Sequence, residues 1–127
     1  ICLGMQIMAK NSEEGKLSGL GWIDAEVKKF NFGVNKSDLR IPHMCWNEIT
    51  PKKSSRLLLH NYKNSRYYFV HSYYMEANKK ENILATTNYG VEFVSAVEKN
   101  NLYGVQFHPE KSHKYGMILL KNFKSLS

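Results

Sequence analysis

The stretch 82–107, NILATTNYGVEFVSAVEKNNLYGVQF, decides the fold class of this chain. Its apolar, β-branched and aromatic residues are typical of strands. Turn residues divide it at 88–90 (Asn-Tyr-Gly) and at 100–101 (Asn-Asn). The stretch therefore predicts three strands joined by two turns.

The segments before this stretch also have the composition of strands. Residues 66–75, RYYFVHSYYM, predict a buried strand, and residues 40–49, RIPHMCWNEI, are β-rich, although Pro42 restricts its neighbours to an edge or entry position. Residues 21–30 alternate apolar and polar side chains and precede a loop at 31–37. Residues 55–62, SRLLLHNY, are apolar but leave the secondary structure open.

Helices are expected at the two ends of the chain. Residues 3–12 place Leu3, Ile7 and Met8 on one side at helical spacing. From Ser112 onward, a second helical stripe is flanked by lysines. The members of this stripe are Tyr115, Ile118, Leu119 and Phe123. The predicted order of elements is therefore helix, many strands, helix.

Composition limits the possible classes of protein. With 127 residues, 43% of them hydrophobic, the chain can form one domain with a modest core. The net charge of +7 arises from scattered Lys and Arg, so we expect no nucleic-acid partner. No apolar run approaches the roughly 20 residues of a membrane span. Cys2 and Cys45 are too few for a disulfide scaffold and lack metal-ligand spacing, so we expect a cytoplasmic protein without a metal or cofactor.

Cys2 is a candidate nucleophile. It precedes Leu3 and Gly4 at what the pattern predicts to be a strand-to-helix junction, where a tight turn exposes a side chain. The positive end of the following helix would favour its thiolate. The alternative is a small buried hydrophobic residue.

His108 and Glu110 are candidates for the base and its partner. In extended chain, residues two apart point the same way, so Glu110 can reach one imidazole nitrogen while the other faces outward. Together with Cys2 they would form a triad. A surface His-Pro-Glu turn is the alternative, and spacing does not single out His108 from the other histidines. These are His43, His60, His71 and His113.

The two end motifs resemble a known family. CLGMQ (2–6) and GVQFHPEKS (104–112) are similar to the nucleophile elbow and the His-x-Glu segment of class I, triad-type glutamine amidotransferases. The resemblance implies a flavodoxin-like three-layer α/β fold that lacks its N-terminal strands and helices. On this reading, residues 1–127 are the C-terminal part of a single amidotransferase domain.

The resemblance also implies roles for these residues. Cys2 would attack the side-chain amide of glutamine, giving a γ-glutamyl thioester and ammonia. His108 would move the proton, and Glu110 would orient His108. No cofactor is implied.

Substrate-binding roles are implied for residues around the nucleophile and in the HSYY motif. The backbone N–H of Leu3 would stabilise the oxyanion, and Gly4 would allow a tight turn and close approach. Gln6 and the backbone around Ser72 and Tyr73 would hold the amino and carboxylate groups of glutamine.

Motifs in the middle of the chain resemble family members that pass ammonia to a (β/α)₈-barrel cyclase in histidine biosynthesis. They include SEEG, GLGW, IPHMCWNEI, YFVHSYY, ATTNYG and LKNF. We therefore expect a heterodimer with such a cyclase, and interface roles for Trp46, Tyr73 and Lys111. Core packing is the alternative for Trp46 and Tyr73. Cys45 stands where the family usually has glycine, which would strain the backbone if an unusual angle is needed there.

Two alternative functions stay open. One is a paralogous amidotransferase subunit that feeds ammonia to a sugar-modifying enzyme in surface-polysaccharide synthesis. The other is a partner-binding fragment without catalysis. Since the resemblance places a second oxyanion donor in a loop upstream of Cys2, these 127 residues alone are expected to be a poor glutaminase.

Overall fold

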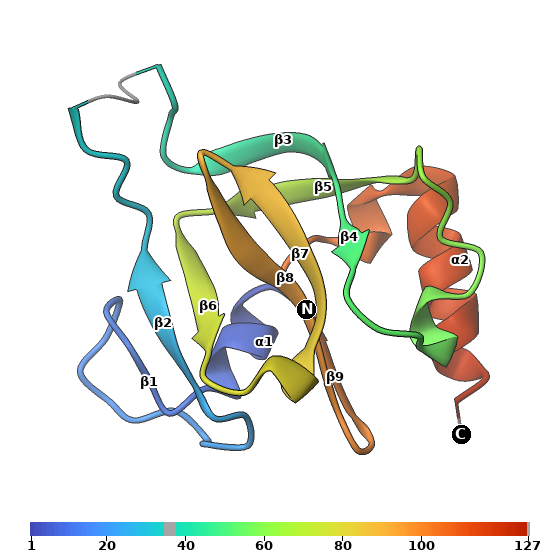
Figure 1. Ribbon diagram of the computed structural model, residues 1–127, viewed down its shortest axis with the longest axis horizontal. Coiled ribbons are helices and arrows are strands. Elements are labelled where there is room, and N and C mark those ends of the chain that lie inside the picture. The colour runs from blue at the N-terminus through green and yellow to red at the C-terminus, as the bar shows by residue number, and fades with distance from the viewer. Residues whose placement is uncertain (35–37, 127) are drawn as a thin grey trace.

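The computed structural model describes residues 1–34 and 38–126, so positions 35–37 of the predicted loop lie outside the described residues. The chain forms a mixed α/β fold with a central sheet, in which α1 (Leu3–Ile7) lies near the middle of the molecule and α2 (His113–Lys124) lies at one side (Figure 1). Short 3₁₀ turns occur at Arg56–Leu58, Lys80–Asn82 and Pro109–Lys111. The strands are β1 (Asn11–Ser12), β2 (Ala25–Lys29), β3 (His43–Glu48), β4 (Thr50–Pro51), β5 (Arg66–His71), β6 (Tyr73–Ala77), β7 (Ile83–Tyr89), β8 (Val91–Lys99) and β9 (Leu102–Val105).

Within the described ranges, two sheets form. The larger has the order β1-β2-β6-β8-β7-β4, and β9 pairs with β8 outside this path. The smaller consists of β3 and β5. The strands pair antiparallel, except that β1 runs parallel to β2.

The stretch 82–107 folds as predicted, into β7, β8 and β9 joined by tight turns. Gly90, with φ +73°, closes the first turn between Tyr89 and Val91, a conformation that glycine adopts without steric cost. Asn100, with φ +55°, closes the second, and asparagine tolerates this region better than most residues. The predicted C-terminal helix is also confirmed as α2, in which Leu119 is buried.

The N-terminal helix is shorter than predicted. It ends at Ile7, and its buried hydrophobic side chain is Met5, whereas Leu3 and Ile7 are 58% and 45% exposed. The backbone carbonyls of residues 7–9 accept hydrogen bonds from residues 20–23 instead of continuing a helix, and Lys10 N–H donates to Ala25. Long-range pairing therefore overrides the helical spacing of this segment.

The predicted strand at 66–75 is two strands in different sheets. It divides at Ser72, so that β5 pairs with β3 while β6 pairs with β2 and β8. The carbonyl of Ser72 accepts from Phe30 N–H, which fixes the bend beside the end of β2. The bend lines a pocket beside Cys2.

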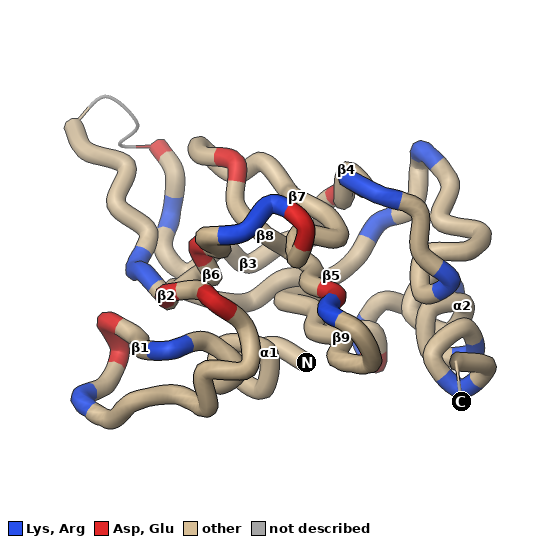
Figure 2. The backbone as a smooth tube through the Cα atoms, turned by 60° about the horizontal axis from the view of Figure 1, so that its bottom comes forward, with Lys and Arg blue, Asp and Glu red and all other residues tan. Residues whose placement is uncertain are grey.

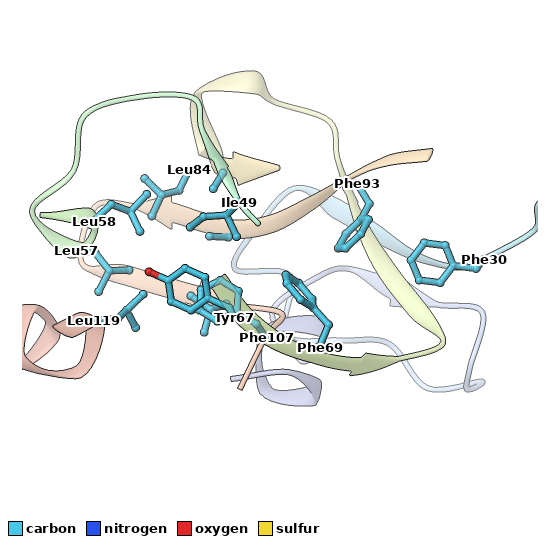
Figure 3. Close-up of a cluster of buried hydrophobic side chains, with 13 residues drawn as sticks. Phe30, Ile49, Leu57, Leu58, Tyr67, Phe69, Leu84, Phe93, Phe107 and Leu119 are labelled. Carbon is cyan, nitrogen blue, oxygen red and sulfur yellow. The ribbon is translucent and has the colours of Figure 1, made fainter. Parts of the chain in front are cut away.

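The main core lies between the β3–β5 pair, the central sheet and α2 (Figures 1 and 3). Phe69 of β5 and Phe107 are fully buried, with ring centroids 5.6 Å apart. Leu119 joins α2 to the same cluster. These contacts hold the segment before His108 against β5.

Charged residues are distributed along the chain. Figure 2 shows Lys and Arg from the β1 region to α2, interspersed with Asp and Glu. Among the described residues, no helix combines the length and hydropathy needed to cross a membrane.

Candidate active site

Cys2 lies at a strained turn directly before α1. Its backbone adopts φ 50° and ψ −112°, a region that non-glycine residues rarely occupy, and its N–H donates to the carbonyl of Val105 at 2.8 Å. The end of β9 thereby holds the turn in place. Such an outlier at a candidate nucleophile is typical of a nucleophile elbow.

The thiol of Cys2 is half-buried and has two polar neighbours besides the Leu3 N–H. Its Sγ lies 4.0 Å from the carbonyl oxygen of Val70 and accepts from Gln106 Nε2 at 3.5 Å. Burial raises the pKa of the Cys2 thiol, outweighing the hydrogen bonds from Leu3 N–H and Gln106 that lower it. The N–H of Leu3, at the start of α1, favours the thiolate as expected, but burial has the larger effect on the pKa. The thiol needs a base.

A pocket opens beside Cys2. Its lining combines the start of α1 with the bend between β5 and β6, two regions about 70 positions apart in sequence. The structure brings together the predicted residues Cys2, Leu3, Gln6, Ser72 and Tyr73, and adds Glu14, Val70 and His71.

Gln6 is 7% exposed and is held by two hydrogen bonds. Its Nε2 donates to the carbonyl of Tyr73 and to Gln106 Oε1, both at 2.9 Å. Gln106 in turn donates to Cys2 Sγ, so a chain of amides joins the bend at Tyr73 to the thiol.

His108 and Glu110 form the predicted contact. His108 Nδ1 lies 2.6 Å from Glu110 Oε1. Partial burial raises the pKa of Glu110. The hydrogen bonds that Glu110 accepts from His108 and from its own N–H lower this pKa, as do the charges of His108 and Lys111. These effects outweigh burial, so the pKa of Glu110 lies below its usual value. An ionised Glu110 accepts the Nδ1 proton, which leaves Nε2 as the basic nitrogen.

Strand β5 brings Cys2 and His108 to one edge. The carbonyl of Tyr68 accepts from His108 N–H at 2.9 Å, and the carbonyl of Val70 lies against Cys2 Sγ. Carbonyls two residues apart on a strand point to the same side and are separated by about 7 Å. The thiol of Cys2 and the backbone N–H of His108 therefore contact neighbouring carbonyls along the same edge of β5.

Ser112 fixes the His-Pro-Glu turn, a role that the sequence analysis did not assign. It is fully buried, and its Oγ donates to the carbonyl of His108 at 2.6 Å and accepts from Tyr68 N–H at 3.0 Å. Gly116 supports the same turn, because a Cβ there would overlap with the carbonyl of Pro109. Helix α2 can therefore pack directly against it.

Trp46 and Lys111 lie in an exposed aromatic cluster. The ring of Trp46 is stacked on that of His113 at 5.3 Å and meets that of Tyr68 at 6.0 Å, while Lys111 Nζ lies 5.9 Å from the Tyr68 ring centroid. Trp46 is 38% exposed, on the face of β3 opposite to the buried His43.

Two expectations about backbone constraint are not met. Cys45 lies within β3, pairs with Phe69 and has no left-handed backbone, so it causes no strain where the family usually has glycine. A Cβ on Gly4 would meet no atom within 4 Å, and Gly4 is not among the glycines with positive φ. The turn itself does not require glycine at position 4.

Tyr73 is half-buried and packs against the smaller core cluster as well as lining the pocket.

Two residues of this site gave weak sequence signals. Gln106 is buried within the apolar run before His108, and a buried amide in such a run indicates a specific hydrogen-bond role. Glu14 is exposed, and only the path of the chain brings it to the pocket. No group of three or more His, Cys, Asp or Glu side chains in residues 1–34 and 38–126 could hold a metal ion.

The model of the family described as "Glutamine amidotransferase class-I" matches residues 1–125. The chain is 52% identical over 126 residues to "Imidazole glycerol phosphate synthase subunit HisH" of Leptospira interrogans, covering 99% of this chain and 62% of that protein. It is 54% identical over 123 residues to the HisH 2 subunit of Methanococcus maripaludis, covering 97% of this chain and 59% of that protein. For the HisH 2 subunit of Pseudomonas aeruginosa the identity is 47% over 126 residues, with 99% and 61% covered. The chain thus spans about three fifths of the length of these curated relatives.

Proposed function

The chain belongs to the class-I glutamine amidotransferase family, and on this premise we propose that it hydrolyses glutamine to glutamate and ammonia. The observation that carries the proposal is the arrangement along β5. The backbone N–H of His108 bonds to the carbonyl of Tyr68, and the carbonyl of Val70, two residues further along β5, lies against the thiol of Cys2, which supports a triad of Cys2 with the His108–Glu110 pair.

The proposed chemistry begins with proton transfer from Cys2 to Nε2 of His108. Glu110 holds Nδ1–H and stabilises the imidazolium that forms. The thiolate attacks the side-chain amide carbon of glutamine, and the Leu3 N–H donates to the oxyanion. His108 then gives its proton to the amide nitrogen, which leaves as ammonia when the C–N bond breaks, and a water molecule hydrolyses the thioester to glutamate.

Substrate binding is proposed to use opposite ends of the pocket. The carboxylate of Glu14 fits the α-ammonium group of glutamine. Gln6, through its side-chain oxygen, would also accept from the α-ammonium group. The backbone around Ser72 and Tyr73 would hold the α-carboxylate, leaving the side-chain amide directed at Cys2.

We further propose that the ammonia passes to a (β/α)₈-barrel cyclase that makes imidazole glycerol phosphate in histidine biosynthesis, and that the two chains form a heterodimer. Support comes from relatives of about 50% identity that are named as subunits of imidazole glycerol phosphate synthase. The exposed cluster around Trp46 and Lys111, in which Lys111 directly follows Glu110, is the proposed contact surface. Both cysteines are unpaired, which supports a reducing compartment such as the cytoplasm.

Covalent trapping tests the nucleophile. Incubating the full-length gene product with a glutamine analogue that carries an electrophilic diazoketone should add one label at Cys2, located by peptide mass spectrometry. Cys2→Ser should lose both the label and glutamate release. Labelling at Cys45 instead would overturn the assignment.

Glutamate release with and without the cyclase subunit tests coupling. We expect a low basal rate that rises when the cyclase and its substrate are present. Equal rates would contradict coupling, and stimulation only by a sugar-modifying partner would support the paralogue. If neither partner gives any glutamate, the partner-binding alternative holds.

A further inference from the structure

Two histidines that the proposed chemistry does not use lie beneath the pocket. His43 is fully buried and His71 is 6% exposed, and His43 Nδ1 lies 3.0 Å from His71 Nε2. They are opposite each other in the β3–β5 pair.

Aromatic rings surround this pair. The ring of His43 is stacked between those of Phe69 and Tyr89, with centroids at 4.8 Å and 4.1 Å. The ring of His71 lies 5.3 Å from Phe30 and 5.1 Å from Phe93. These contacts restrict rotation of both imidazoles, so their nitrogen atoms have fixed partners.

The partners determine the tautomers. His71 Nδ1 lies 2.8 Å from the carbonyl oxygen of Tyr73, which can only accept, so Nδ1 of His71 carries the proton. His71 Nε2 must then accept, and the donor is His43 Nδ1. His43 Nε2 is left to accept from the amide of Asn47 at 3.3 Å, and the same amide donates to the carbonyl of Asn88. The hydrogen bonds that link Asn47, His43, His71 and the Tyr73 carbonyl form a row. Each of them has one donor and one acceptor only if both imidazole rings are neutral and protonated on Nδ1.

The row ends at the candidate site. The Tyr73 carbonyl accepts from both His71 and Gln6, and Gln6 is linked through Gln106 to Cys2 Sγ. His71 and Tyr73 also line the pocket. The carbonyl of Tyr73 is therefore the joint between the histidine pair and the residues proposed to hold glutamine.

We propose that His43 and His71 are positioning residues, which hold the bend at 71–73 in the geometry that binds glutamine. This inference rests on the proposed function. His71 orients the Tyr73 carbonyl, and His43 selects the tautomer of His71 that can do so. The two rings neither touch the scissile amide nor exchange a proton with it.

The first test is spectroscopic and needs no variant to fold. Long-range ¹H–¹⁵N correlation spectra of the labelled full-length gene product at neutral pH report which nitrogen of each imidazole is protonated. We expect His43 and His71 both to carry the proton on Nδ1, the tautomer that free histidine populates less. An Nε2–H tautomer or a charged ring at either position would overturn the proposal.

The second test separates binding from chemistry. His71→Phe keeps the ring but removes both nitrogens, and we expect KM for glutamine to rise about tenfold with kcat changed less than about threefold. His71→Asn keeps a donor near the position of Nδ1, so its KM should return most of the way to the wild-type value. His60→Asn is the matched control, because His60 is exposed and its φ of +62° suits asparagine, so KM should stay that of the wild type.

The outcomes separate the two proposals. A wild-type protein without glutaminase activity, with or without the cyclase subunit, would contradict the proposed function and, with it, the kinetic part of this inference. An active wild type whose KM is unchanged by His71→Phe would contradict the positioning role alone. Equal kinetics of the Phe and Asn variants would also contradict it, since a packing role predicts no rescue.

Discussion

The buried histidine pair predicts that this protein loses stability in mildly acidic solution. Burial, with a smaller contribution from the charge of His71, lowers the pKa of His43 from 6.5 to about 3. Burial also lowers the pKa of His71 to about 4, because it outweighs the hydrogen bond to the Tyr73 carbonyl, which raises that pKa. Both rings stay neutral in the folded chain while the unfolded chain takes up protons below pH 6.5. Stability is therefore fully present above about pH 6.5 and falls as the pH drops toward 4.

The size of the loss follows from linkage. Between pH 7.5 and 5.5, a histidine with an unfolded pKa of 6.5 that stays neutral when folded loses about 1.4 kcal/mol. Two such residues lose about 3 kcal/mol together, a large share of the 5–15 kcal/mol typical of a domain. This interval lies above the usual carboxylate range, so His43 and His71 dominate the change.

Urea unfolding, followed by tryptophan fluorescence at pH 7.5 and 5.5, measures this loss as a shift of the midpoint. The double variant His43→Phe/His71→Phe should lose about 3 kcal/mol less between these pH values than the wild type. His60→Asn serves as the control and should keep the full loss. If wild type and double variant lose the same stability over this interval, the histidines are not held neutral by burial and the reasoning is wrong.

Three further predictions concern the elbow and the turn that carries the base. Cys2→Ser should abolish glutamate release whereas Cys45→Gly should leave it largely intact, and the reverse result would exchange their roles. Ser112→Ala removes the hydroxyl that ties the His-Pro-Glu turn to β5, so kcat should fall about tenfold, and an unchanged kcat would show that the turn is held without it. Gly116→Ala should lower the free energy of unfolding by about 1–3 kcal/mol, because the added Cβ would overlap with the backbone of Pro109. Gly4→Ala is the helical control with open space around the added Cβ, and it should not lower the stability. Equal melting temperatures of the two variants would contradict this prediction.

The sequence by itself determined the features that depend on neighbouring residues. The hairpins of 82–107 follow from local turn chemistry, because Gly90 and Asn100 tolerate positive φ between apolar runs. The contact between His108 and Glu110 was predicted as well, but from an extended chain, whereas Glu110 lies in the 3₁₀ turn Pro109–Lys111 and it is this turn that brings the carboxylate to Nδ1. The resemblance of the two end motifs was enough to indicate the family.

Only the tertiary structure decided what depends on residues far apart in the chain. Periodicity could not end α1 at Ile7 or divide 66–75 at Ser72, because backbone groups of distant segments occupy the hydrogen bonds there. The link from Gln106 to Cys2 joins residues 104 positions apart, and the pairing of His43 with His71 needs β3 and β5 in register. Residue types fix which hydrogen bonds a side chain can make, but only the folded backbone fixes which partner lies within reach.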